Sequence, residues 1–116
     1  MVKLESLKKS YQFQKTLKEK KVHSEFFSIF ATKNFFQPEN KSSLLISFVM
    51  KKKIGNAVKR NKIRRKLKAI EKKLLKKRGA ISKDYTYIVL GKSNAYTQKQ
   101  TVLMPVMEKC FNKIKI

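Results

Sequence analysis

The sequence is poor in the residue types from which disulfides and metal sites are built. Among its 116 residues, Cys110 is the single cysteine and His23 the single histidine. A single cysteine cannot form an intramolecular disulfide. One Cys and one His are also too few ligands to build a zinc site. A lone cysteine fits a reducing compartment, so we expect a cytoplasmic protein.

Long apolar runs are also missing. No segment approaches the roughly 20 apolar residues of a membrane-spanning helix, and the opening MVKLESLKKS lacks the continuous apolar stretch of a signal peptide. A cationic helix on a membrane surface is an alternative, but its apolar side would have to stay exposed. We therefore expect no membrane partner.

Acidic residues are few and scattered. The seven carboxylates are Glu5, Glu19, Glu25, Glu39, Glu71, Asp84 and Glu108. No two have the spacing of a metal-binding pair, so a two-metal nuclease site is not expected. His23 stands in a polar segment and is expected at the surface rather than as a general base. The sequence predicts no catalytic residue and no certain metal site in the protein.

Positive charge is what the sequence has in excess. It contains 30 Lys and Arg, a net charge of +23, and 41% apolar residues, enough for a folded domain rather than a basic tail. Half of the basic residues lie between Lys51 and Arg78, where Glu71 is the only carboxylate. Such a segment repels itself unless a polyanion neutralises it, so nucleic acid is the first partner to consider.

Apolar patterning predicts a single domain over residues 1–116. We expect helices at 10–18, from 55 or 56 to 78, and at 103–114, with strands at 26–32, 44–50 and 85–90. A further short strand is possible between residues 18 and 26, which otherwise form a polar turn. Residues 1–9 are expected to be a basic, partly ordered arm. The order α-β-β-(β)-α-β-α indicates a two-layer α/β (α+β) sandwich with a small mixed sheet of three to four strands.

Helix ends are predicted from capping residues. Ser10 is the expected N-cap of the first helix, and Gly79 the expected stop of the long helix. Pro105 must lie in the first turn of the last helix or kink it. Gly55 and Asn56 join a strand to a helix N-terminus, where free N–H groups attract phosphate. The same pair also suits a tight turn with a helix cap, and both roles are compatible.

The long helix has two chemically different sides. Ile63, Leu67, Ile70 and Leu74 form one apolar stripe. Asn61, Arg65, Lys68 and Lys72 repeat at the same spacing on nearly the opposite side, with Arg60 and Arg64 on the flank. Most charged helix faces are simply solvated, but here no carboxylate supplies i,i+4 pairs through Ala69. The pattern therefore favours nucleic-acid binding.

The segment KKIGNAV at residues 52–58, followed by RNKIRR at 60–65, resembles the RNR signature of the bacterial ribonuclease P protein subunit. Weaker similarity covers Leu7 to Lys15, Phe27 to Phe30 and Lys83 to Tyr85. The resemblance implies a left-handed βαβ crossover. It also implies a protein that joins a catalytic RNA and assists removal of the 5′ leader from precursor transfer RNA, with Mg²⁺ held mainly by the RNA and no protein partner required.

The resemblance also implies roles for individual residues. The RNA-binding residues it predicts are Lys52, Lys53, Asn56, Arg60, Asn61, Lys62, Arg64, Arg65 and Lys68. Phe13, Leu17 and Phe30 are predicted to line a cleft for the leader, although each Phe alone would more often be a core residue.

The sequence departs from the family pattern in four places. Leu17 stands where an aromatic residue is usual, Lys51 replaces a Ser, and an Arg and a Gly of the second strand are replaced near Leu45 and Ser47. The leader contacts are therefore less defined than the RNR helix. The alternative function is a non-catalytic ribosomal or ribosome-assembly RNA-binding protein, which shares the charge and size but gives no reason for the GNAV and RN motifs.

Overall fold

A computed structural model describes residues 3–33, 43–77, 81–82 and 85–114. The strands are β1 (Lys3–Glu5), β2 (Lys20–His23), β3 (Phe27–Lys33), β4 (Ser43–Met50) and β5 (Tyr85–Gly91). The α-helices are α1 (Ser10–Lys18), α2 (Ala57–Leu75) and α3 (Gln100–Ile114). Two short 3₁₀ helices, η1 (Lys52–Ile54) and η2 (Ser93–Tyr96), precede α2 and α3.

The strands form one five-stranded mixed sheet in the order β1-β4-β5-β3-β2. β4 is parallel to β1 and β5, and β3 is antiparallel to β5 and β2. The sheet therefore has one strand more than the three to four expected. The edge strands β1 and β2, of three and four residues, are too short to give a clear alternating pattern. β1 lies in the expected basic arm, and β2 is the short strand considered between residues 18 and 26.

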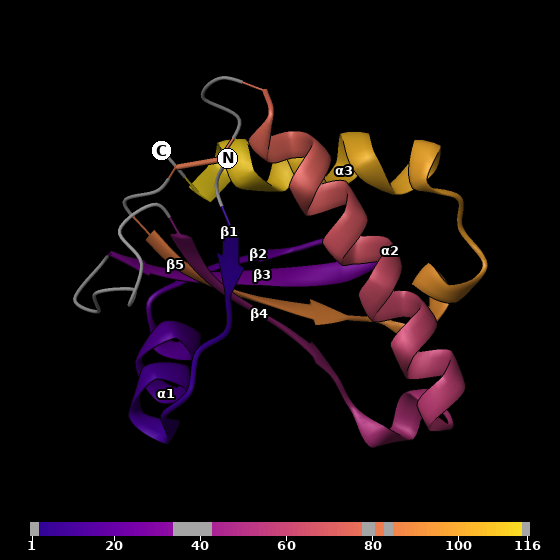
Figure 1. Cartoon of the computed structure of the whole chain (residues 1–116), viewed down its shortest axis with the longest axis horizontal. Coiled ribbons are helices and arrows are strands. Elements are labelled where there is room, and N and C mark those ends of the chain that lie inside the picture. Colours follow the sequence, from indigo (N-terminus) through magenta and orange to yellow (C-terminus); the bar gives the residue numbers. More distant parts are fainter. Residues whose placement is uncertain (1–2, 34–42, 78–80, 83–84, 115–116) are drawn as a thin grey trace.

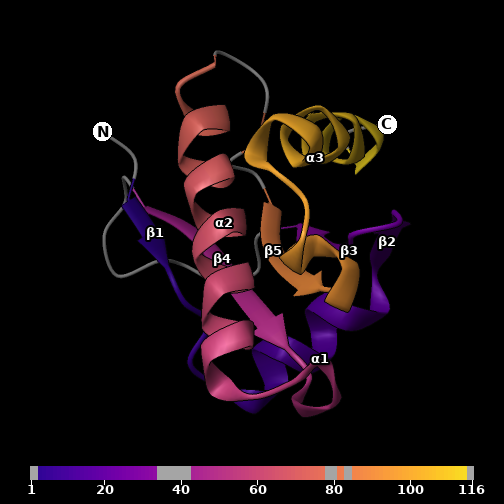
Figure 2. The ribbon, with the colours of Figure 1, turned by 90° about the vertical axis from the view of Figure 1, so that its right-hand side faces the viewer.

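The α2 connection between β4 and β5 has the uncommon hand. α2 and α3 cover one face of the sheet and α1 packs on the other (Figure 1). When the sheet is viewed from its α2 side with β4 and β5 pointing upward, β5 lies to the left of β4 (Figures 1 and 2). This is the left-handed crossover that the resemblance implies and that the general rule disfavours.

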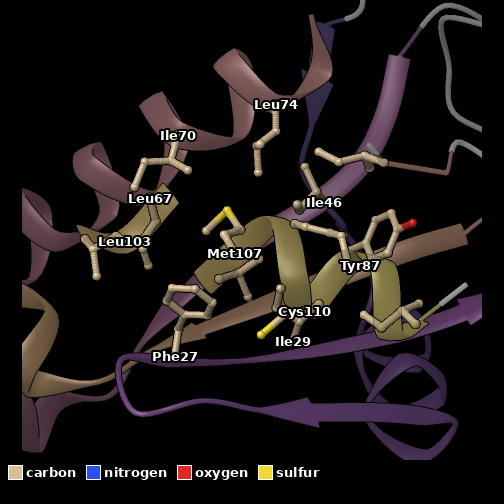
Figure 3. Packing of buried hydrophobic residues seen from close by; sticks show 14 of the residues in the cluster. Phe27, Ile29, Ile46, Leu67, Ile70, Leu74, Tyr87, Leu103, Met107 and Cys110 are labelled. Carbon is tan, nitrogen blue, oxygen red and sulfur yellow. The ribbon is translucent and has the colours of Figure 1, made fainter. Parts of the chain in front are cut away.

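The main core lies between the sheet and the α2–α3 layer. Alternate residues of the central strands, among them Phe27, Ile29, Ile46 and Tyr87, point into it from the sheet (Figure 3). The helices add Ile63, Leu67, Ile70, Leu74, Leu103, Met107, Cys110 and Phe111. Tyr87 and Phe111 meet edge to face with ring centroids 5.0 Å apart. The predicted stripe of α2 is thus the core side of that helix.

The cap of α1 differs from the expectation. Lys9, not Ser10, is the extended N-cap residue. The Gln12 side-chain oxygen accepts the backbone N–H groups of Lys8 at 3.0 Å and Lys9 at 3.1 Å. The Lys9 carbonyl accepts the backbone N–H groups of Gln12 at 3.0 Å and Phe13 at 3.4 Å, so the N–H that a Ser cap would bind already has an acceptor.

The other helix ends show which local predictions hold. Asn56 is the N-cap of α2, and its Oδ1 accepts the N–H of Lys59 at 2.9 Å. Gly55 has φ +154°, a conformation that a side chain would strain. α2 ends at Leu75 rather than Arg78, and the predicted stop Gly79 lies outside the described residues. Pro105 is the sixth residue of α3, so the first of its two predicted alternatives, a place in the first turn, is excluded.

Candidate nucleic-acid interface

The outer side of α2 is a cationic surface fixed by the packing of its inner side. Ile63, Leu67, Ile70 and Leu74 are all 0% exposed. The side chains on the outer side are exposed: Asn61, Arg65, Lys68 and Lys72. Because the apolar stripe is buried against the core, these side chains must face outward. We refer to these four exposed residues as the outer face of α2.

Two arginines on the flank of α2 are half-buried. The Arg64 guanidinium donates through Nη1 to Asn61 Oδ1 at 2.7 Å and through Nε to the carbonyl of Phe48 at 3.4 Å. These contacts tie the first half of α2 to β4 and orient the Asn61 amide. Arg60 Nε is buried and has no hydrogen-bond partner within the described residues. A buried donor left without a partner is uncommon and calls for a specific explanation.

The strand-to-helix entry adds further exposed groups. Lys52 and Lys53 are exposed in η1, and Asn56 is exposed while capping α2. Val58, in the first turn, is 73% exposed although it is apolar. The predicted RNA-binding residues from Lys52 to Lys68 thus lie along η1 and on the outer face and the two flanks of α2.

The opposite flank of α2 carries a feature that the sequence did not predict. The ammonium groups of Lys59 and Lys62 lie 5.2 and 4.8 Å from the centroid of the Tyr96 ring, in η2. Lys66 Nζ donates to the backbone carbonyls of Tyr96 at 2.5 Å and Gln98 at 2.8 Å. Desolvation, and then the nearby charge of Lys62, lower the pKa of Lys66. Lys66 therefore anchors η2 to α2 and is not a free surface cation.

The outer face of α2 is not neutralised from within the described part of the chain. The ion pairs Lys15–Glu19 and Lys77–Glu108 involve none of the residues of this face. Glu71, the only acidic residue of α2, is 0% exposed and points away from solvent. The charge of the outer face is therefore available to an external polyanion.

A second apolar cluster lies on the α1 side of the sheet. It contains Leu7, Phe30, Leu45 and Ile88, with Phe13 packed against them. The structure thus brings Phe13 and Phe30 together, whereas Leu17 is 40% exposed at the edge. Phe30 is only 9% exposed, so most of its ring surface is used in packing.

Two of the sequence departures have a structural role on this side. Ser47 Oγ accepts the backbone N–H of Leu7 at 2.9 Å and is itself buried. Leu45 is 7% exposed in the same cluster. Both residues hold the segment that leads into α1 against β4. This long-range contact could not be derived from the sequence pattern.

The described residues contain no group of three or more His, Cys, Asp or Glu side chains that could hold a metal ion. A two-metal reaction centre would need several such ligands close together. None of the described helices is both long and apolar enough to cross a membrane.

Fold and surface together define a small α+β domain in which one helix presents an exposed cationic face. The family described as Ribonuclease P matches residues 1–115, and the chain belongs to this family. A ribonuclease P protein component of Mycoplasma capricolum is 30% identical over 109 residues, which cover 94% of each chain.

Solved structures agree with this assignment. The ribonuclease P protein of Staphylococcus aureus superposes with a TM-score of 0.68 at 26% identity, covering 96% of this chain and 95% of that one. The ribonuclease P protein of Thermotoga maritima gives a TM-score of 0.73 at 21% identity, covering 94% and 96%. At that lower identity the likeness concerns the fold alone.

Proposed function

We propose that this chain is the protein subunit of ribonuclease P and binds the catalytic RNA through the outer face of α2. The observation that carries the proposal is the division of α2 into a fully buried stripe and an exposed amide-and-cation face without carboxylates. Phosphate contacts from such a face are sequence-independent and strongly salt-dependent. The unpartnered Arg60 Nε supports the proposal, because an RNA phosphate or base oxygen would supply its missing acceptor.

The 5′ leader of precursor transfer RNA is proposed to bind on the α1 side of the sheet. Phe13 and Phe30 lie there in one cluster, and Lys52 and Lys53 follow directly after β4. Cations for the backbone and ring surfaces for the bases are the two requirements of single-strand binding. This side is therefore the best site that the chain offers for an unpaired strand.

The chemical step is assigned to the RNA. Removal of the leader is hydrolysis of a phosphodiester bond, and Mg²⁺ supplies a metal-bound water and charge stabilisation for such reactions. In the proposal the RNA holds the Mg²⁺, and the protein positions the substrate. No additional protein partner is invoked, and the assembly belongs to the cytoplasm.

Reconstitution tests the proposal. Purified protein is combined with a bacterial ribonuclease P RNA and a leader-bearing precursor at low and at moderate Mg²⁺. The expected result is cleavage at the mature 5′ end that the protein stimulates, most strongly at low Mg²⁺. No stimulation at either concentration, with the protein shown to be folded, would contradict it.

A further inference from the structure

A row of four side chains crosses the sheet on its α1 side. Val49 of β4 pairs with Leu90 of β5, Leu90 with Ser28 of β3, and Ser28 with His23 of β2. Paired residues on neighbouring strands point to the same face of a sheet. Ser28 is two residues from Phe30 and Leu90 is two residues from Ile88, and both Phe30 and Ile88 belong to the cluster on the α1 side. Side chains two residues apart in a strand share a face, so the row also faces the α1 side. Four strands spaced about 4.8 Å apart make it about 14 Å long.

This row is more open than the row beside it at β4 and β5. In the neighbouring row, Ser47 and Ile88 are 6% and 1% exposed. In the row itself, Val49 and Leu90 are half-buried, Ser28 is buried and His23 is exposed. Beyond Val49, the chain passes through Met50 to the exposed Lys51, Lys52 and Lys53. The row is thus a partly apolar strip with cations near one end and an exposed ring at the other.

The exposed ring of His23 is held in place by two contacts. Its Nδ1 is 2.7 Å from Ser28 Oγ, and the Ser28 side chain is buried. Its ring meets Phe30 edge to face, with centroids 6.1 Å apart and planes at 85°. Phe30 uses nearly all of its own surface in packing, so His23 is the ring of this pair that a ligand can reach.

We propose that the row of Val49, Leu90, Ser28 and His23 binds single-stranded RNA, with a base stacked on the His23 ring. An exposed planar ring, a partly apolar floor and cations at one end are the features that bind unpaired nucleotides. The inference rests on the proposed function, because the strand in question is the 5′ leader. It assigns His23 a role in substrate binding rather than in proton transfer.

The test uses holoenzyme reconstituted from the protein and the catalytic RNA. Affinities for leader-bearing precursor and for mature transfer RNA are compared for His23→Ala, His23→Phe and Tyr11→Ala. Tyr11 is the matched control, because it is an aromatic residue, 58% exposed, two residues from Phe13 and hence on the other side of α1. A stacked base is worth about 1–3 kcal/mol, so His23→Ala should weaken precursor binding about 5- to 150-fold.

The other measurements separate stacking from structure. His23→Phe should keep most of the precursor affinity, and mature transfer RNA binding should stay unchanged in all variants. Both His23 variants remove the partner of the buried Ser28 hydroxyl, so their melting temperatures should fall alike, and affinities are measured well below these temperatures. Precursor affinity of His23→Ala equal to that of the parent, or an equal loss in Tyr11→Ala, overturns the inference. So does an equal loss for mature transfer RNA. These outcomes are distinct from failure of the proposed function, in which the parent protein itself would not stimulate cleavage.

Discussion

Replacing Glu71 should stabilise this protein and remove part of its pH dependence. Glu71 is 0% exposed in α2, and neither carboxylate oxygen has a hydrogen-bond partner within the described residues. Desolvation raises the pKa of Glu71 well above its ordinary value. A buried polar group without a partner costs about 1–3 kcal/mol, so Glu71→Leu should raise the free energy of unfolding at pH 7 by about that amount. In a domain of roughly this size, each kcal/mol raises Tm by about 4–8 °C.

The sign of the pH effect follows from the raised pKa. The folded state keeps the Glu71 proton to a higher pH than the unfolded state, which loses it near pH ~4.3. Stability is therefore greatest below that value and falls by up to about 1.4 kcal/mol per pH unit until the folded pKa is reached. Glu71→Gln keeps the shape but cannot titrate, so it should lose this slope while still burying a polar group.

Urea unfolding followed by circular dichroism, at several pH values from 5 to 8, measures both effects. The difference between the parent and Glu71→Gln isolates Glu71 from the other titrating groups. If the parent and Glu71→Gln have the same pH slope, Glu71 is not a buried neutral acid. If Glu71→Leu is less stable than the parent at pH 7, Glu71 has a stabilising partner in the folded protein.

Three further predictions concern function. Arg65→Ala should weaken binding to the catalytic RNA and flatten the log–log salt dependence by about 0.7–0.9, with an unchanged melting temperature. An unchanged salt slope would make the outer face of α2 a solvated surface only. Phe13→Ala should weaken holoenzyme affinity for leader-bearing precursor by about 1–3 kcal/mol, or roughly 5- to 150-fold, with little change for mature transfer RNA. Equal losses for both RNAs would show that Phe13 contributes only to packing of the core. The protein without RNA should not cleave precursor in a gel assay, because the described residues hold no metal-ligand cluster. Clean cleavage at the mature 5′ end would refute the assignment of the chemical step to the RNA.

The architecture around the site was only partly accessible from the sequence. The long strands β3, β4 and β5 were predicted within a residue or so, because their apolar residues are enough to mark a buried strand. The edge strands were harder. β1 has three residues, and β2 contains Val22 as its one apolar residue, so their pairing depends on neighbours far away in the chain.

What the sequence alone determined is the two-sided α2 helix. Its stripe and its cationic face follow from a local period of 3.6 residues, and burial of the stripe leaves the cations outside. The GNAV and RN motifs lie in the same continuous segment, so the predicted RNA-binding residues needed no tertiary information to be placed together.

The tertiary structure alone decided which distant residues share a surface. His23 seemed from the sequence to be an isolated residue of a polar turn, yet strand pairing places it beside Ser28 and in one row with Leu90 and Val49. Glu71 resembles an ordinary helical carboxylate in the sequence, yet packing buries it completely. Both outcomes depend on strand order and helix placement, which arise from contacts between residues tens of positions apart. Such contacts produce no periodic pattern in the local sequence from which they could be predicted.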